Sequence, residues 1–178
     1  MKKSPLLLEF LGFVFTGVAG TLLHFVFDWS NGNIVTSLFS AVNESIWEHM
    51  KLLYFPMVIF ALYESRYFKN QFNFWCAKAV GIASGVMIIP VIYYSYTGAL
   101  GIKCDWFNIT IFFIATAFVY YLETMILKNN RRCFISPTVS KVFILILGVL
   151  FVIFTFLPPR IPLFCDPLDS TYGYFKFI

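Results

Sequence analysis

Residues 6–29 read LLLEFLGFVFTGVAGTLLHFVFDW, an apolar run in which only Glu9 and Asp28 are charged at neutral pH. A helix needs about 20 mostly apolar residues to cross the hydrocarbon core of a bilayer, and this run is long enough. The apolar part of a secretory signal peptide spans only about 7–15 residues, whereas this run continues to Phe27. We therefore predict an uncleaved transmembrane helix.

Four more apolar stretches follow, and the composition of the chain agrees with them. Hydrophobic residues make up 60% of the 178 residues and charged residues 12%, whereas soluble domains are about half apolar and a quarter charged. We predict an all-α integral membrane protein, a bundle of five transmembrane helices in a single domain that covers residues 1–178. The predicted spans are residues 6–29, 47–63, 74–96, 106–127 and 139–157, followed by a tail at 158–178.

The segment between the first two spans is too short to cross a membrane. Residues 34–42 are half apolar and follow Asn31-Gly32-Asn33, a sequence typical of a turn. An interfacial helix, a re-entrant segment and an early turn of the second span all fit this pattern. The sequence leaves the three alternatives open.

The distribution of basic residues indicates the orientation of the bundle, because cytoplasmic loops carry an excess of Lys and Arg. An arrangement with the N-terminus inside and the C-terminus outside leaves only Lys51, Lys103, Arg160 and Lys176 on the outer side. The cytoplasmic side then holds the other basic residues, which are Lys2, Lys3, Arg66, Lys69, Lys78, Lys128, Arg131, Arg132 and Lys141. Most acidic residues fall outside, so the outer face would attract cations.

The densest polar stretch lies where the second span enters the membrane from outside. Residues 43–51 read NESIWEHMK, and Glu44 and Glu48 at this spacing would share one helix face. Charged groups near the apolar region are costly and suggest a functional site. The structural alternative is a capping box formed by Ser45 and Glu48, with Glu48 also paired to an interfacial lysine. The candidate ligand-binding residues of this stretch are Asn43, Glu44, Trp47, Glu48, His49 and Lys51.

The first helix offers a partner face for this stretch. Gly17, Gly20, His24 and Asp28 follow one another at helical spacing, and the glycines would let a neighbouring helix approach closely. His24 and Asp28 are therefore candidates for the same site, at a depth similar to that of His49. For His24 the simpler alternative is a buried histidine that holds a backbone carbonyl.

The tail adds one more candidate. Four prolines between residues 158 and 167 predict a stiff, extended segment. It either folds back over the outer mouth as a lid that carries Asp166, or it forms a simple strap at the exit of the last span.

The element at residues 43–51, Asn-Glu-Ser-x-Trp-Glu-His-x-Lys, combines with a Pro-rich tail that contains Asp166-Pro167 and Tyr172-Gly173. This combination resembles a group of small uncharacterised bacterial multi-pass membrane proteins. The resemblance extends over most of the chain and implies a multi-pass protein of the bacterial cell (cytoplasmic) membrane with the same helical architecture. It implies no activity, because none is established for that group.

Two classes of function use the polar residues directly. A polar pocket in the outer half of the bundle would bind or transport a small cationic or amphiphilic molecule, or a lipid headgroup. Five helices are few for a carrier, so we expect a homodimer or a partner membrane subunit. Alternatively, a membrane-embedded metal-dependent enzyme of the hydrolase type would hold a zinc-like divalent ion. Its candidate ligands are His24, His49, Glu44 and Glu48.

Two further interpretations are narrower. Haem held between His24 and His49 would need the two imidazoles to face each other coaxially. An accessory subunit of a membrane complex would use the polar stretch to bind another protein. Nucleic-acid binding is not expected, because the basic residues lie in short loops and form no basic patch with stacking aromatics.

The chain has four cysteines. The predicted topology places Cys76 and Cys133 in the cytoplasm, where thiols stay reduced. It places Cys104 and Cys165 outside, so a Cys104–Cys165 bridge across the mouth and two unpaired thiols both remain open.

Overall fold

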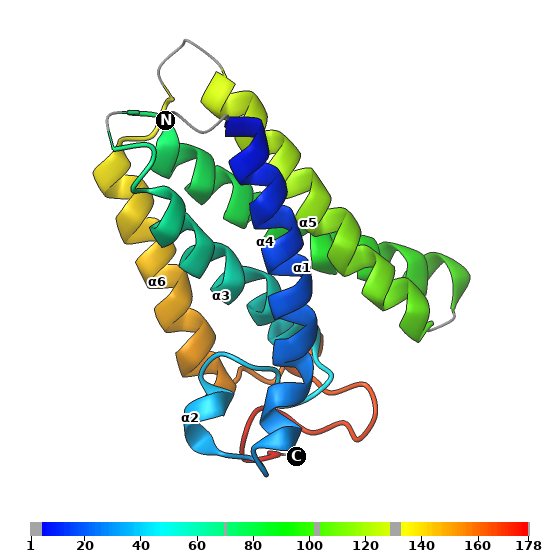
Figure 1. Ribbon diagram of the computed structural model, residues 1–178. Helices are drawn as coiled ribbons and strands as arrows, with labels where there is room; N and C mark the ends of the chain where they lie inside the picture. Colours follow the sequence, from blue (N-terminus) through cyan, green and yellow to red (C-terminus); the bar gives the residue numbers. More distant parts are fainter. Residues whose placement is uncertain (1–4, 70, 102–103, 129–132, 178) are drawn as a thin grey trace.

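The computed structural model describes residues 5–69, 71–101, 104–128 and 133–177 (Figure 1). Within these residues the chain is helical, and its only strand-like pairs are two isolated bridges in the tail. The helices are α1 (Pro5–Trp29), α2 (Ile34–Ser37), α3 (Ile46–Glu64), α4 (Phe74–Leu100), α5 (Asp105–Lys128), α6 (Pro137–Phe156) and the 3₁₀ helix η1 (Pro162–Phe164).

Long helices occur at all five positions predicted from the sequence. Four of them, α1, α4, α5 and α6, are long and apolar enough to cross a membrane. Their outward faces carry large exposed apolar side chains such as Phe10 on α1 and Leu145 on α6. Soluble proteins rarely expose such large apolar surfaces to water, so these faces are expected to contact lipid. These helices support a membrane protein.

The helix α3 does not meet the same test of length and apolarity. It carries Glu48, Lys51 and Glu64, and it contacts α1, α4 and α6 (Figure 1). Most of its residues are buried. A helix that other helices shield from lipid does not need an apolar surface, so a span of this kind would escape a search based on hydropathy. The five-span topology stays a prediction.

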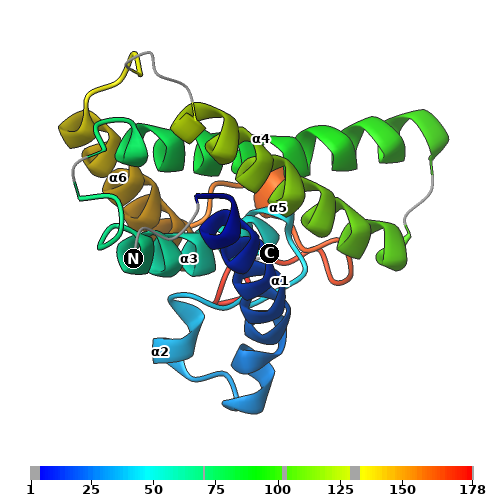
Figure 2. The ribbon, with the colours of Figure 1, turned by 45° about the horizontal axis from the view of Figure 1, so that its top comes forward.

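The contact between α1 and α3 is close because α1 carries glycine there. A Cβ atom at Gly20 would lie 2.7 Å from the backbone oxygen of Leu52 on α3 and 2.5 Å from the ring of Phe112 on α5. Small residues permit such backbone approaches between membrane helices. By contrast, the connected ends of α4 and α5 project away from the other helices (Figures 1 and 2).

The short helix α2 and the tail gather at one end of the bundle, where α1 ends and α3 begins (Figure 1). The short helix α2 is capped by Asn33, whose Oδ1 accepts a hydrogen bond from the amide of Val35. The tail folds back against this end, where Phe164 packs on Trp47 with ring centroids 4.8 Å apart. The amide of Tyr174 donates to the carbonyl of Thr155 at 2.8 Å. Of the two alternatives for the tail, the structure has the folded-back one.

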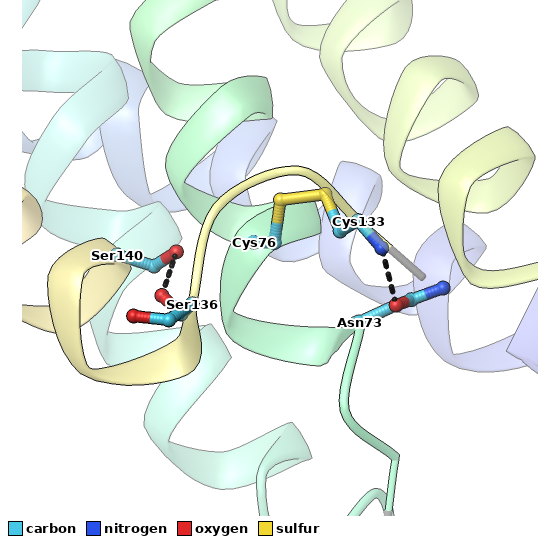
Figure 3. Close-up of a disulfide and its surroundings, with 5 residues drawn as sticks. All are labelled: Asn73, Cys76, Cys133, Ser136 and Ser140. Atoms are coloured by element: carbon cyan, nitrogen blue, oxygen red, sulfur yellow. Dashed lines mark hydrogen bonds between the residues drawn. A yellow bond between two sulfur atoms is a disulfide. The ribbon is translucent and has the colours of Figure 1, made fainter. Parts of the chain in front are cut away.

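The cysteine pairing differs from the sequence-based expectation. Cys76 and Cys133 form a disulfide with Cα atoms 6.3 Å apart (Figure 3). Cys104 and Cys165 form no disulfide. The expectation of reduced thiols at Cys76 and Cys133 is therefore wrong for this structure. The physical reason is proximity: Asn73 accepts a hydrogen bond from the amide of Cys133, which holds the segment before α6 against the start of α4.

This disulfide bears on the orientation of the bundle. Disulfides persist in oxidising compartments, so the Cys76–Cys133 bond and the distribution of basic residues favour opposite orientations. Several of the basic residues used for the orientation lie outside the described residues, namely Lys2, Lys3, Lys103, Arg131 and Arg132. The N-in, C-out orientation therefore stays a prediction.

Candidate metal centre

Three of the predicted ligands meet at the end of the bundle where α1 ends and α3 begins. His24 comes from α1, His49 from the first turn of α3, and Glu44 from the loop just before α3. Glu44 Oε1 lies 3.7 Å from His24 Nε2, and Glu44 Oε2 lies 3.5 Å from His49 Nε2. One ligand atom from each residue can be chosen so that all three lie within 4.8 Å of one another. We call these residues the His–Glu–His group.

These spacings are close to those of a metal site. Ligands at the usual bond lengths of about 2.0–2.2 Å around a tetrahedral zinc ion are separated by roughly 3.4 Å. The distances of 3.5 and 3.7 Å are too long for hydrogen bonds, so the carboxylate is not locked to either imidazole. Small side-chain rotations would bring the three ligand atoms onto one ion. All three residues are partly exposed, which leaves room for water or a substrate at a fourth position.

The imidazole of His49 is held in the state that a metal ligand requires. Its Nδ1 atom lies 2.9 Å from the carbonyl oxygen of Ser45. A carbonyl only accepts hydrogen bonds, so Nδ1 carries a proton, and in the neutral ring it is Nε2 that has the free lone pair. This Nε2 is the atom that faces Glu44. Metal-binding histidines are oriented by a partner of this kind on the other ring nitrogen.

The backbone of Glu44 is fixed by the tail. Asp166 is buried, and its Oδ2 accepts a hydrogen bond from the amide of Glu44 at 3.2 Å. Its Oδ1 accepts from the amide of Leu168 at 2.8 Å. One residue later, Ser45 caps α3 and accepts a hydrogen bond from the amide of Glu48. The tail and the helix cap therefore place Glu44 opposite the two histidines, and Asp166 acts as a positioning residue.

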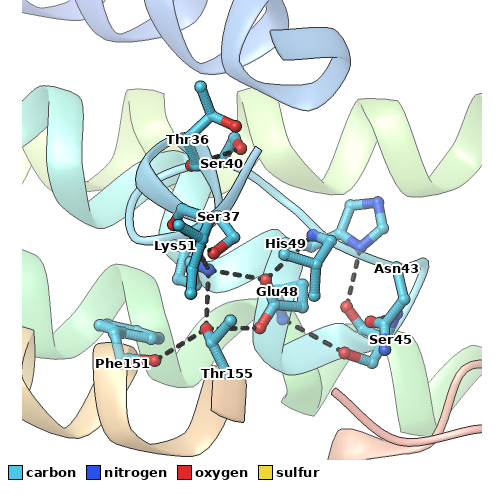
Figure 4. A network of polar contacts seen from close by, with 12 residues as sticks. Thr36, Ser37, Ser40, Asn43, Ser45, Glu48, His49, Lys51, Phe151 and Thr155 are labelled. Carbon is cyan, nitrogen blue, oxygen red and sulfur yellow. Dashed lines mark hydrogen bonds and ion pairs between the residues drawn. The ribbon is translucent and has the colours of Figure 1, made fainter. Parts of the chain in front are cut away.

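Glu48, the fourth predicted ligand, takes no part in this group. Its Oε2 lies 2.7 Å from the Nζ of Lys51, and its Oε1 accepts a hydrogen bond from Thr155 of α6 (Figure 4). Lys51 also donates to the carbonyl of Ser37 and to Thr155. Both charged side chains are buried. This network ties α3 to α6 and to the α2 segment. It contains the Glu48–Lys51 ion pair of the structural interpretation, but the pair is buried and not interfacial.

Three other predicted site residues, Asn43, Trp47 and Asp28, do not belong to the His–Glu–His group. Asn43 accepts a hydrogen bond from the amide of Ser45 and so shapes the turn before α3. Trp47 is buried against Phe151, with ring centroids 4.6 Å apart. Asp28 is exposed one turn beyond His24 and does not belong to the group.

A concavity of about 320 Å³ opens between the tail and α4. Ile46, Tyr93 and Tyr172 help to line it, whereas none of the three residues of the His–Glu–His group does. This concavity is therefore not the expected polar pocket. The candidate site is a surface-accessible group of ligand atoms.

A second charged cluster was missed by the sequence analysis. Lys78 of α4 lies among Glu9 of α1, Glu64 of α3 and Glu123 of α5, all of them buried. The sequence does contain a sign of this cluster, because three of the predicted spans carry a charged residue: Glu9, Lys78 and Glu123. Charges within membrane helices are rare and functional by default. The basic-residue count instead treated Lys78 as an ordinary cytoplasmic charge.

Comparison with known proteins locates the chain in one family. No curated protein matches it, and no solved structure does. A model of the family described as "Family of unknown function (DUF6512)" matches residues 5–174. The match covers α1 to α6, the His–Glu–His group and most of the tail. The chain therefore belongs to the family of unknown function DUF6512.

Proposed function

We propose that this protein binds a small cation at the outer end of a five-helix membrane bundle, and that the cation is a divalent transition metal ion. The observation that carries the proposal is the convergence of His24, Glu44 and His49, whose ligand atoms lie within 4.8 Å of one another. Two imidazoles and one carboxylate suit zinc and its neighbours, whereas calcium and magnesium prefer sites made of oxygen ligands.

The geometry favours a metal ion over the other ligands considered. Haem would need a flat macrocycle between the two imidazoles, where the carboxylate of Glu44 approaches both Nε2 atoms. A large amphiphilic molecule would need a deep cavity lined by the polar residues, and the described concavity has other lining residues. A metal ion needs neither a flat gap between the imidazoles nor a deep cavity.

The bundle would cross the membrane five times, with the N-terminus inside, the C-terminus outside and α3 as the shielded span. This orientation puts the His–Glu–His group on the acidic outer side, where the field would concentrate cations. Transport of the ion would call for a homodimer or a partner subunit, because five helices alone form a small carrier. The distribution of basic residues supports the orientation, and the Cys76–Cys133 disulfide opposes it.

A metal-dependent hydrolase is the second candidate. Three protein ligands with an open fourth position are the arrangement of catalytic zinc sites, which also need a general base for the bound water. Glu48 cannot serve, because Lys51 and Thr155 already engage both of its carboxylate oxygens. Asp28 is the nearest acid left on α1, and it lies outside the group. The structure therefore favours binding over hydrolysis.

The test is metal binding by the purified protein in mild detergent. Protein stripped with a chelator and titrated with Zn²⁺ should bind one ion per chain. His24→Ala, His49→Ala and Glu44→Gln should each weaken the affinity by at least about tenfold, because each removes one of three ligands. Asp169→Asn, which changes an exposed acid of the tail, is the matched control and should leave binding unchanged. Wild-type protein without a stoichiometric site, or equal binding by all variants, would overturn the proposal.

The same preparation separates binding from hydrolysis. Metal-dependent cleavage of ester or amide substrates that disappears with His49→Ala and with Asp28→Asn would support the hydrolase. Binding without cleavage would support the first candidate.

A further inference from the structure

The second charged cluster lies at the opposite end of α1 from the metal centre. Glu9 and His24 are 15 residues apart on α1, which is about 22 Å along a helix. Lys78 Nζ lies 3.1 Å from Glu9 Oε1, 2.5 Å from Glu64 Oε2 and 2.6 Å from Glu123 Oε2. We call these four residues the Lys78 cluster. Each comes from a different helix, so the cluster is where α1, α3, α4 and α5 meet.

The charges of the cluster do not balance. Three carboxylates surround one ammonium group, so full ionisation would leave two negative charges without a counter-charge. All four side chains are at most 2% exposed, and the described residues offer no second cation to them. Uncompensated charge in a buried site is strongly unfavourable, because the ion has lost its hydration without gaining a partner. Such groups normally take up protons and become neutral instead.

Individual oxygen atoms show where those protons would be. Lys78 approaches Oε2 of both Glu64 and Glu123, while Oε1 of each is buried without a hydrogen-bond partner among the described residues. A buried carboxylate oxygen with no donor is expensive. A proton on either carboxyl converts an unpaired acceptor into a neutral hydroxyl and removes one of the excess charges.

The packing around Glu123 leaves little space for a larger ion. A Cβ atom at Gly81 of α4 would lie 2.5 Å from Glu123 Oε1 and 2.7 Å from its Cγ. The carboxyl therefore rests directly on the backbone of α4. On the other side of the cluster, the Lys78 ammonium lies 5.4 Å from the ring centroid of Tyr120. A proton adds no volume to this arrangement, whereas a metal ion with its ligand shell does.

The cluster lies close to the end of the bundle at which α3 stops. Glu64 is the last residue of α3, and the loop at residues 65–69 begins directly after it. Tyr67 in that loop is exposed. Glu64 thus adjoins a loop that reaches the surface of the protein.

We propose that the Lys78 cluster is a buried proton-binding site in which two of the three carboxyls carry a proton at neutral pH. Each proton comes from hydronium in the solvent, which leaves as water, and adds to a carboxylate oxygen as an O–H bond. It returns to a water molecule when the carboxyl ionises again. Lys78 stays an ammonium group and balances the remaining carboxylate. Ionisable groups inside membrane bundles serve as proton relays in pumps and transporters. The alternative is a purely structural ion-pair lock with ionised carboxylates.

Infrared spectroscopy tests this directly, because a protonated carboxyl has a carbonyl stretch that is separate from those of carboxylates and amides. Wild-type protein in chelator-treated detergent at neutral pH should show protonated carboxyls equivalent to about two per chain. Exchange into D₂O should shift the band. The chelator makes the result independent of the metal centre, so either proposal can fail alone.

Substitutions in the Lys78 cluster then show whether the protonated-carboxyl band belongs to its glutamates. Glu64→Gln and Glu123→Gln should each lower the band by about half, since each removes one excess negative charge. Lys78→Met should raise the band, because three carboxyls would then need protons. Asp169→Asn is the control and should leave the band unchanged. If one of the two glutamine variants fails to fold, the other one still assigns the band, and a wild-type protein without the band overturns the proposal by itself.

Three outcomes would overturn the proposal. Wild-type protein without a protonated-carboxyl band means that the three glutamates are ionised. A band that Glu64→Gln and Glu123→Gln both leave intact belongs to other residues. A band that NaCl abolishes while KCl preserves means that the cluster is a sodium site.

Discussion

The Nδ1 atom of His49 lies 2.9 Å from the carbonyl oxygen of Ser45, one helical turn earlier. This contact keeps the proton of the ring on Nδ1, so a metal ion would bind Nε2 in place of a second proton. Metal binding to histidine competes with protonation. We expect the affinity for Zn²⁺ to fall as the pH is lowered from about 8 to 5, with protons released on binding. Calorimetric titrations in two buffers of different ionisation enthalpy measure both effects. An affinity that does not change with pH would argue against histidine ligands.

Asp166 should act on the metal centre without binding the ion. Its carboxylate accepts a hydrogen bond from the amide of Glu44 at 3.2 Å, so Asp166→Ala should free the loop before α3 and weaken Zn²⁺ affinity about tenfold or more. The stoichiometry should stay at one ion per chain, because the three ligands remain. Substitutions of groups that orient metal ligands cost about 10–100-fold in affinity. Loss of the site altogether would make Asp166 a ligand, and an unchanged affinity would show that the tail does not position Glu44.

The Glu48–Lys51 pair should matter for stability and not for metal binding. Both side chains are buried, and together they join α3 to Thr155 of α6. Removal of one partner of a buried ion pair costs about 3–5 kcal/mol, because the other charge is left unpaired. Glu48→Gln and Lys51→Met should each lower the melting temperature in detergent. The double variant should lose less than the sum of the two. Folded protein of either single variant should still bind one Zn²⁺, and loss of the ion by Glu48→Gln alone would restore Glu48 as a ligand.

The two unlike outcomes for Glu44 and Glu48 show what the sequence could and could not predict. Their spacing of four residues places them on one face only if both are helical. Ser45 is the N-cap of α3, so Glu44 precedes the helix and its direction is set by the tail, 122 residues later in the chain. Helical periodicity does not apply to it. The positions of α1, α4, α5 and α6 were predictable because length and apolarity determine them locally.

The Lys78 cluster could not be predicted from the sequence for a related reason. Lys78 meets Glu9 and Glu123 across separations of 69 and 45 residues, and no local pattern links residues so far apart. Each charge sits close to the end of a predicted span, where the basic-residue count treats it as part of a loop. Only the packing of α1, α3, α4 and α5 brings the four side chains together.

The cysteines test the orientation of the bundle. Cys76 and Cys133 are close enough to bond whenever an oxidant is present. If this end faces the cytoplasm, as the basic residues indicate, both thiols should be reduced in the cell. Cells quenched with an alkylating reagent before lysis should then yield four alkylated cysteines per chain, and protein oxidised after purification should yield two, at Cys104 and Cys165. A Cys76–Cys133 disulfide already present in quenched cells would reverse the proposed orientation.

Gly81 and Gly98 of α4 provide a matched pair for the packing of the Lys78 cluster. A Cβ atom at Gly81 would lie 2.5 Å from Glu123 Oε1, whereas a Cβ atom at Gly98 would meet nothing within 4 Å. Glu123 cannot retreat easily, because its Oε2 is held by Lys78 at 2.6 Å. Gly81→Ala should therefore destabilise the protein by about 1–3 kcal/mol, the usual cost of overpacking.

Gly98→Ala should be neutral or stabilising by up to about 1 kcal/mol, since alanine favours a helix over glycine. Thermal unfolding in detergent compares the two substitutions on the same helix. If glycine were needed only for flexibility of α4, both substitutions would change the melting temperature in the same direction. A fall in melting temperature for Gly81→Ala alone would instead locate the constraint at the contact with Glu123. Only at Gly81 does the added methyl group meet a side chain that an ion pair holds in place.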